Sequence, residues 1–380
     1  MSKLVEGIKD RVVAAAREAA PAVVDAAQKA ATAAAEKVAE AVADAKNAAE
    51  ETSVASEPVT AAEPAAATAA QAPEGAIFNP ENARGNLHLG IDVGSTTVKL
   101  AVLNDDNQIV YAKYQRHHTD VRACARDLFE GAATVLPTAQ MTCAITGSGG
   151  LLLSQWLDLE FVQEVIASKR AVETLIPAID VAIELGGEDA KIIYFDNGIE
   201  QRMNGTCAGG TGAFIDQMAT LLHTDASGLN ELAANATTIY PIASRCGVFA
   251  KTDVQPLLNE GARPEDVAAS IFQAVVTQTI SGLACGRPIR GNVAFLGGPL
   301  QYLSELRHRF YLTLNLDEEH RIVPQNAHLF VASGAAMAHE SNKLSTFPQL
   351  IEAIDALGDT QGAEVERLDP LFATDEDFAE

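Results

Sequence analysis

The stretch Leu89-Gly-Ile-Asp-Val-Gly-Ser-Thr-Thr-Val-Lys99 decides the fold, because it joins two predicted strands through a glycine turn. Gly94 allows the backbone to turn and to approach a ligand closely. The turn can hold phosphate oxygens, and Asp92 at the strand end can hold Mg²⁺ through water. The predicted phosphate contacts are Gly94, Ser95, Thr96, Thr97 and Lys99. The spacing matches neither the Walker A loop nor G-x-G-x-x-G, and taken alone it also suits a polar hairpin.

The segment Ile183-Glu-Leu-Gly-Gly-Glu-Asp-Ala-Lys191 repeats this design of strand, acidic residue, glycine turn and strand. Its acidic residue is Glu184, and its predicted phosphate contacts are Gly186, Gly187 and Glu188. A third turn follows a buried strand in Phe295-Leu-Gly-Gly-Pro299, where Gly297 and Gly298 are predicted to accept adenosine or its α-phosphate.

Across residues 86–340 these three turns resemble the superfamily of acetate and sugar kinases, heat-shock ATPases and actin. The resemblance implies an α/β protein with a two-domain acetate/sugar kinase–heat-shock ATPase–actin-like fold. Each domain would hold a mixed sheet, and the nucleotide would lie between the two domains.

Two cysteines lie in small, polar, glycine-rich settings. Cys207 is in Asn204-Gly-Thr-Cys-Ala-Gly-Gly-Thr-Gly212, and Cys246 is in Ser244-Arg-Cys-Gly247. An iron–sulfur cluster usually takes four thiolates, so two copies of the chain are needed to hold one. This count favours a symmetric dimer with a shared cluster, while two unrelated buried thiols or a zinc site remain the alternatives.

The cysteine segments resemble those of the 2-hydroxyacyl-CoA dehydratase activases, in the BadF/BadG/BcrA/BcrD ATPase family. The resemblance implies a homodimer with one 4Fe-4S cluster at its axis, held by Cys207 and Cys246 of each chain. It implies an ATP-dependent activase that passes a low-potential electron to an iron–sulfur dehydratase or reductase, with a ferredoxin- or flavodoxin-like donor. ATP and Mg²⁺ are the other implied cofactors, with Asp92 and Glu184 organising Mg²⁺ and water. The run that follows Cys207 would sense the phosphates through Gly210 and Thr211.

The sequence departs from the shorter activases at three places. Glu184 stands where an aspartate is usual, Glu188-Asp189 replaces Gln-Asp, and Thr146-Gly-Ser-Gly-Gly150 replaces a Gly-Tyr-Gly-Arg-like stretch. These variants resemble the N-terminal activase segment of the long, multi-domain members. The alternative functions are a small-molecule kinase of the sugar kinase type and a nucleotide-switched binding protein with a redox-sensing cluster.

The composition narrows the class of protein. The chain has 380 residues and a formal net charge of −24, which disfavours nucleic acid as a partner. It contains five cysteines, an odd number, and no C-x-x-C pair, signal-peptide core or membrane-spanning apolar run is found. We therefore expect a cytoplasmic protein in a reducing compartment, with no membrane partner.

The expected organisation follows the changes in composition along the chain. The parts are an Ala-rich helical extension over 1–50, a disordered linker over 51–85, ATPase domain I over 86–180 with a C-terminal return over 332–345, ATPase domain II with the cluster cysteines over 181–331, and an acidic tail over 358–380.

The hydrophobic patterns predict the following elements. The predicted strands cover 87–89, 98–103, 108–115, 142–146, 181–185, 191–195, 293–296 and 329–331. The predicted helices cover 122–135, 161–176, 208–222, 264–283 and 333–341. A helix over 208–222 would place Cys207 at its positive N-terminal end, which favours a thiolate. The other cysteines, Cys124, Cys143 and Cys285, are interpreted as packed thiols.

Overall fold

The computed structural model describes residues 72–196, 198–205, 208–244 and 246–357. All of them belong to the second of two compact units of the chain, Ala69–Glu380. The predicted Ala-rich helix over 1–50, most of the predicted linker, the acidic tail over 358–380 and Cys207 lie outside the described residues.

The first sheet is built on an antiparallel meander of three long strands, β2 (Leu87–Val93), β3 (Thr97–Asn104) and β4 (Ile109–Arg116). Strand β5 (Met141–Thr146) lies parallel to β2 on its free side. The order is β1-β4-β3-β2-β5-β12, and β6 also pairs with β5. The short strands are β1 (Ile77–Phe78), β6 (Glu160–Phe161) and β12 (Leu344–Ser345).

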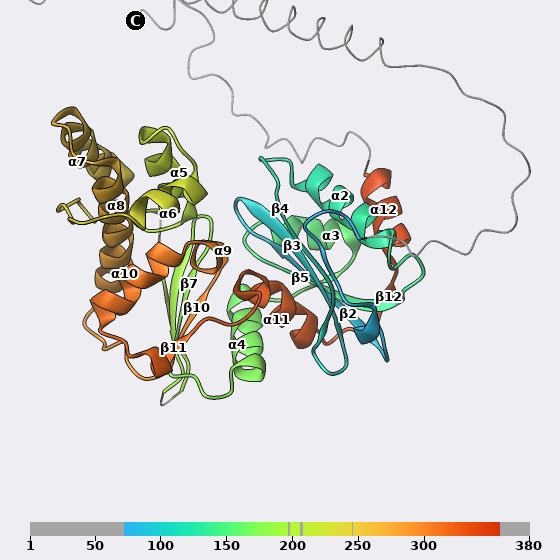
Figure 1. The fold of residues 1–380 in the computed structure, drawn as a ribbon. Coiled ribbons are helices and arrows are strands. Elements are labelled where there is room, and N and C mark those ends of the chain that lie inside the picture. The colour runs from blue at the N-terminus through green and yellow to red at the C-terminus, as the bar shows by residue number, and fades with distance from the viewer. Residues whose placement is uncertain (1–71, 197, 206–207, 245, 358–380) are drawn as a thin grey trace, which may run out of the picture. The chain divides into compact units, whose positions relative to one another are not determined.

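The second sheet repeats this plan. Its meander is β7 (Val181–Leu185), β8 (Ala190–Tyr194) and β9 (Glu200–Met203), and β10 (Val293–Leu296) lies parallel to β7. With β11 (Arg321–Ile322) at the edge, the order is β11-β10-β7-β8-β9. The two similar α/β halves expected from the sequence are therefore confirmed (Figure 1).

Helices cover the outer face of the first sheet. They are α2 (Val121–Ala133), α3 (Gly150–Leu157) and α12 (Phe347–Ala356). The α2 helix begins where the Asp120 side chain accepts a hydrogen bond from the amide of Ala123, and α12 begins with a capping box at Thr346. Phe129 of α2 and Phe347 of α12 pack together over the sheet, with their ring centroids 6.0 Å apart.

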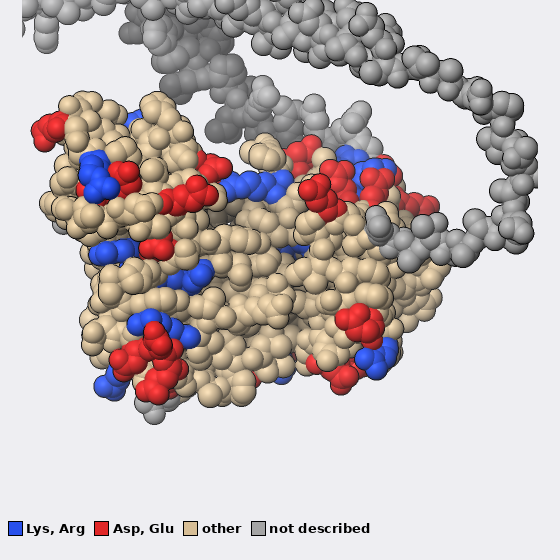
Figure 2. Space-filling view, viewed as in Figure 1, with Lys and Arg blue, Asp and Glu red and all other residues tan. Residues whose placement is uncertain are grey.

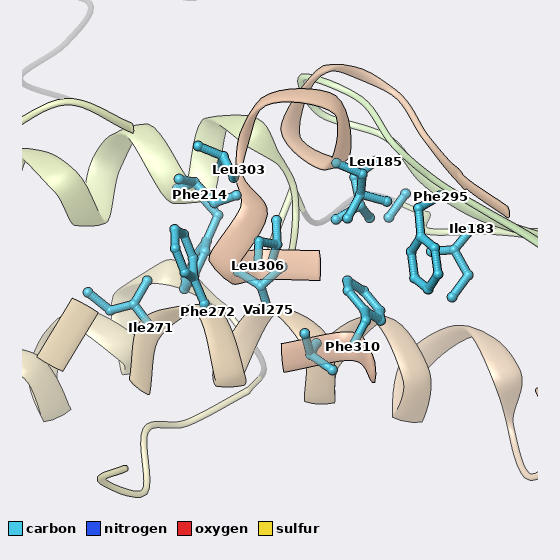
Figure 3. Close-up of a cluster of buried hydrophobic side chains, with 14 of the residues drawn as sticks. Ile183, Leu185, Phe214, Ile271, Phe272, Val275, Phe295, Leu303, Leu306 and Phe310 are labelled. Atoms are coloured by element: carbon cyan, nitrogen blue, oxygen red, sulfur yellow. The ribbon is translucent and has the colours of Figure 1, made fainter. Parts of the chain in front are cut away.

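The second sheet carries a larger helical layer on its outer face. Figure 3 shows Phe310 next to Phe295 of the sheet, with their ring centroids 5.8 Å apart. Phe272 and Val275 of the long helix belong to the same buried cluster. The helices of this layer are α5 (Gly212–Leu221), α6 (Ala226–Ala233), α7 (Gly247–Asn259), α8 (Pro264–Thr279) with its π-helical end Ile280–Ala284, α9 (Gly298–Tyr302) and α10 (Ser304–Leu314).

By length and composition, Pro264–Ala284 is the one helix of the described residues that is apolar enough to cross a membrane. Of its apolar window, 67% is buried inside the fold, where α8 supplies much of the core of the second half. Burial to this extent is typical of a helix in the core of a folded domain.

Two helices lie between the sheets, α4 (Glu164–Leu175) and α11 (Phe330–Ala338). They pack closely, because a Cβ atom on Gly334 of α11 would overlap the carbonyl oxygen of Ala167 in α4. Seven consecutive residues of α11, Phe330–Ala336, are buried. Short 3-10 turns complete the described elements at Pro80–Asn82 (η1), Glu318–His320 (η3) and Ala327–Leu329 (η4).

The structure corrects three expectations about the elements. The strand predicted over 329–331 is wrong, because these residues end η4 and begin α11. The helix predicted over 208–222 begins at Gly212, since Gly210 has a φ of +80° that a right-handed helix excludes. The end of the predicted linker is ordered, because β1 and η1 lie before residue 86 and β1 pairs with β4.

The viewed face of the molecule (Figure 2) carries charged side chains of both signs. Figure 2 shows Lys and Arg interspersed with Asp and Glu on this face, with wide uncharged areas between them.

Candidate functional site

A cleft lies between the two halves and is lined by the three glycine turns recognised in the sequence. Its walls include Thr96, Thr97 and Lys99 from the first half, and Gly186, Gly187, Gly297 and Gly298 from the second. The start of α5 and the turn before α11 complete it. The structure therefore brings parts of all three predicted turns, which are far apart in the chain, to the walls of one cleft.

The β2–β3 turn is tight, with the amide of Gly94 donating to the carbonyl of Thr97 at 2.9 Å. Asp92 and Lys99 are partners across the two strands, and Lys99 Nζ lies 2.5 Å from Asp92 Oδ2. Burial works to lower the pKa of Lys99, but the Asp92 carboxylate outweighs it and the pKa lies above its usual value. The pair thus places the Lys99 ammonium group at the cleft wall, bound to a buried carboxylate that does not line the cleft itself.

A buried histidine supports this turn from behind. The amide of Thr119 donates to His117 Nδ1 at 3.0 Å, so the proton of a neutral His117 is on Nε2, which lies 3.2 Å from the carbonyl oxygen of Gly94. The amide of His117 also donates to the carbonyl of Thr96 at 3.2 Å. His117 therefore fixes the turn that the sequence predicts to hold phosphate.

The β7–β8 turn has the same construction. The amide of Gly186 donates to the carbonyl of Asp189 at 2.7 Å. Glu184 is only 6% exposed and faces Lys191 across the strands, with Lys191 Nζ 3.3 Å from Glu184 Oε1. Ser168 of α4 donates to Glu184 Oε2 at 3.3 Å, so both carboxylate oxygens have partners.

The two turns touch each other across the cleft. A Cβ atom on Gly187 would overlap the hydroxyl oxygen of Thr96. On the other side, α5 begins on the second turn: the amides of Gly212 and Ala213 donate to the carbonyls of Gly186 and Gly187 at 2.9 and 2.8 Å. The second turn and the start of α5 are therefore joined by two backbone hydrogen bonds.

The third turn needs its glycine. Gly297 has a φ of +88°, and a Cβ atom there would overlap the carbonyl oxygen of Leu185. Beyond it the cleft is lined by apolar groups that suit the flat face of a base, namely Ile215, Ala226, Pro299 and Leu303.

Several predicted residues do not line the cleft. Asp92, Gly94 and Ser95 lie in or beside the first turn, behind its lining atoms. Thr211 is buried and precedes α5, and its hydroxyl donates to the carbonyl of Ala208. Gly210 lies against Gln278 and Thr279 of α8, and the Glu188 carbonyl accepts from the side chain of Asn204 at 2.9 Å.

Other cleft residues were not found from the sequence. Tyr114, Tyr302 and His328 form an aromatic group, with the His328 ring 5.6 Å from Tyr114 and 5.2 Å from Tyr302. Arg116 of β4 forms an ion pair with Asp216 of α5 at 2.9 Å. These residues come from β4, α5, α9 and η4, so no local pattern indicates the groups that they form. Glu164, which contacts Lys191, was also missed.

Cys246 is half-buried and directly precedes α7. The next residue, Gly247, lies against α5, where its Cβ position is 3.2 Å from Gln217 Oε1 and 3.7 Å from the Phe214 ring. Val248 and Phe249 follow and are 71% and 60% exposed. Cys246 therefore lies near the helix that follows the Cys207 segment, beside exposed apolar side chains.

The remaining cysteines differ from it. Burial raises the pKa of Cys124 to about 11 and that of Cys143 to about 12, so both are packed thiols as expected. The expectation for Cys285 is wrong: it is exposed and follows the π-helical end of α8 in a left-handed conformation.

The sequence of residues 89–338 matches the BadF/BadG/BcrA/BcrD ATPase family. The (R)-2-hydroxyglutaryl-CoA dehydratase activating ATPase of Acidaminococcus fermentans is 34% identical over 221 residues, which cover 56% of this chain and 83% of that protein. The 2-hydroxyisocaproyl-CoA dehydratase activator of Clostridioides difficile is 31% identical over 265 residues, covering 67% of this chain and 97% of the relative.

Solved structures agree. The crystal structure of component A of the Acidaminococcus fermentans dehydratase has a TM-score of 0.60 at 28% identity, covering 70% of this chain and 99% of the other. The Clostridium difficile activator with bound ADPNP has a TM-score of 0.58 at 26% identity, covering 73% and 99%. The expected two-domain acetate/sugar kinase–heat-shock ATPase–actin-like fold is confirmed.

Proposed function

Because the chain belongs to the BadF/BadG/BcrA/BcrD ATPase family, we propose that it is an ATP-hydrolysing activase. It would pass a low-potential electron from a 4Fe-4S cluster shared by two copies of the chain to a 2-hydroxyacyl-CoA dehydratase or a related CoA-ester reductase. Its relatives are named as activators of such dehydratases. A ferredoxin- or flavodoxin-like protein would be the donor.

The cleft supports the ATPase part of the proposal. Thr96, Thr97 and Lys99 from one side and Gly186 and Gly187 from the other would hold the phosphates, and Gly297 and Gly298 would hold the adenosine side. Asp92 and Glu184 offer carboxylate oxygens, the ligands that Mg²⁺ prefers, and both are buried beside these turns. When bound, Mg²⁺ would neutralise phosphate charge, while the protein supplies position and fixed dipoles.

The single observation that carries the coupling is the bonding of α5 to the second phosphate turn. The turn and the helix share the hydrogen bonds from Gly212 and Ala213, and Gly247 beside Cys246 lies against the same helix. A turn that shifts with the nucleotide state would therefore move α5 and the residues packed on it.

The cluster part rests on the cysteine segments. Cys246 has the setting of a ligand, since it is half-buried before a helix whose free amides favour an anionic group. Cys207 and Cys246 of two copies would supply the four thiolates that one cluster takes. When bound, the cluster would supply the one-electron chemistry.

Anaerobic purification followed by iron, sulfide and ATPase measurements tests this proposal. We expect about four irons for each dimer, and their loss in Cys207→Ala and in Cys246→Ala. Cys285→Ala is the matched control, because that thiol is exposed but lies outside both segments, and it should keep its iron. An iron-free protein that phosphorylates a sugar would contradict the proposal and identify a small-molecule kinase instead.

A further inference from the structure

The two nucleotide hairpins carry matched pairs of charges. In each, a lysine follows the acidic residue by seven positions and lies directly across the strands from it: Lys99 from Asp92, and Lys191 from Glu184. The pairs nevertheless have different surroundings. Lys99 lines the cleft and its side chain is 15% exposed, whereas that of Lys191 is 2% exposed.

Lys191 contacts a second carboxylate besides that of Glu184. Its Nζ also contacts Glu164, which is the first residue of α4. Lys191 is therefore buried between two carboxylates, those of Glu164 and Glu184.

This arrangement fixes the Glu184 carboxylate from both sides. One oxygen accepts from Lys191 and the other from Ser168 of α4. Glu164 and Ser168 both lie on α4. Ser168 contacts Glu184 directly, whereas Glu164 contacts Lys191, which in turn contacts Glu184. A glutamate side chain has more rotatable bonds than an aspartate, and these contacts remove that freedom.

We propose that Lys191 is a positioning residue that holds the Glu184 carboxylate beneath the second phosphate turn, and that Glu164 holds Lys191 in place. This inference rests on the proposed ATPase function, in which Glu184 organises Mg²⁺ and water. The competing role is purely structural: a cation that only neutralises two buried carboxylates.

A double substitution separates the two roles. Lys191→Met alone leaves Glu164 and Glu184 without their cation, and it should lower the melting temperature. Lys191→Met/Glu164→Leu replaces the cation and one of its two carboxylates by apolar groups of similar size, so it should restore part of the melting temperature. In the double variant Glu184 keeps Ser168 but has lost the lysine.

We expect the double variant to lose at least tenfold in kcat for ATP hydrolysis, with KM for ATP changed less than threefold. The Mg²⁺ concentration that half-saturates binding of a fluorescent ADP analogue should rise severalfold. Lys343→Met is the control, because this lysine pairs with Asp158 on the surface at 2.6 Å, and it should change neither value.

Two results would overturn the inference. A double variant with wild-type kcat and Mg²⁺ dependence would show that Lys191 only neutralises charge. Equal losses in kcat and in nucleotide affinity would show a general collapse of the cleft. A wild-type protein that neither binds ADP nor hydrolyses ATP would instead contradict the proposed function itself.

Discussion

At the scale of single residues, His328 is the least expected group of the cleft. Its ring lies against both Tyr114 of the first half and Tyr302 of the second, and these two rings also contact each other. Within the described part of the chain, its Nδ1 is buried without a hydrogen-bond partner. Burial, followed by the nearby Lys99, lowers the pKa of His328 to about 4. The imidazole is thus neutral at physiological pH, with a ring nitrogen held in an apolar setting.

This shift predicts a loss of stability in mild acid. The unfolded chain protonates this histidine below its usual pKa of 6.5, whereas the folded protein does so only near 4. Between these values the unfolded state binds more protons, so stability falls as the pH falls, by about 2 kcal/mol for a partly buried ring. We expect His328→Gln to lose less stability than wild type between pH 7 and pH 5, as measured by urea unfolding.

His320→Gln is the control for this measurement, because His320 lies on the surface in η3, away from the cleft. It should retain the pH dependence of the wild-type protein. Identical curves for wild type and His328→Gln would show that His328 takes no part.

At the scale of elements, the β2–β3 turn and the β7–β8 turn are in close contact at one point. Gly187 leaves room for the Thr96 hydroxyl and methyl groups, and a Cβ atom there has no other space. The cleft can close to this distance only because the second turn carries a glycine at that position.

Gly187→Ala should therefore hold the cleft open and weaken ADP binding by tenfold or more, measured by calorimetry. Gly187→Ala/Thr96→Gly removes the opposing side chain and should recover part of the affinity. Gly282→Ala is the control, since a Cβ atom at this residue meets nothing within 4 Å. Unchanged affinity in Gly187→Ala would mean that the turns separate without cost.

Much of the arrangement of strands and turns was predictable, because short sequence patterns determine it. Both hairpins pair an acidic residue, a glycine turn and an apolar strand, and their strands formed in the expected places. The strand predicted over 329–331 failed for a physical reason. Its residues lie in a stretch that is buried on all sides, so the sequence shows no alternation of apolar and polar residues with a helical period. A short apolar run of this kind is equally typical of a strand.

The predictions for the helix after Cys207 and for the helix after Cys246 went wrong for different reasons. The first begins later than expected because the glycines before Gly212 belong to a turn, and the second was missed because Pro256 interrupts its pattern. The aromatic group around His328 and the contact of Glu164 with Lys191 arise from tertiary packing alone. No sequence pattern within one element encodes them.

At the scale of the whole molecule, the two halves are joined across the cleft by a charged contact. Arg116 of β4 binds Asp216 of α5 through both terminal guanidinium nitrogens, Nη1 and Nη2, at 2.9 and 3.4 Å. Both side chains are partly exposed, so the pair adds little to folding stability, within about 1 kcal/mol. The pair lies at the cleft wall and joins the two halves. We therefore expect it to slow the release of a nucleotide from the cleft.

Arg116→Ala should speed the release of a fluorescent ADP analogue by up to about fivefold, the equivalent of 1 kcal/mol, in stopped-flow measurements. Its melting temperature should stay near that of the wild type. Arg126→Ala is the matched control: Arg126 binds Asp355 at 2.7 Å on the surface of the first half, far from the cleft in the fold. Equal release rates in both variants would contradict this role of Arg116.

Strand β1 also bears on how the protein behaves at high concentration. Its two residues, Ile77 and Phe78, occupy the outer edge of the first sheet by pairing with Tyr111 and Ala112 of β4. An uncovered edge offers free amide and carbonyl groups to any other chain with a strand to add. The family match begins at residue 89, so a chain trimmed to the matched residues would bare this edge. The outer strand of the first sheet therefore comes from a segment that precedes the residues matched by the family.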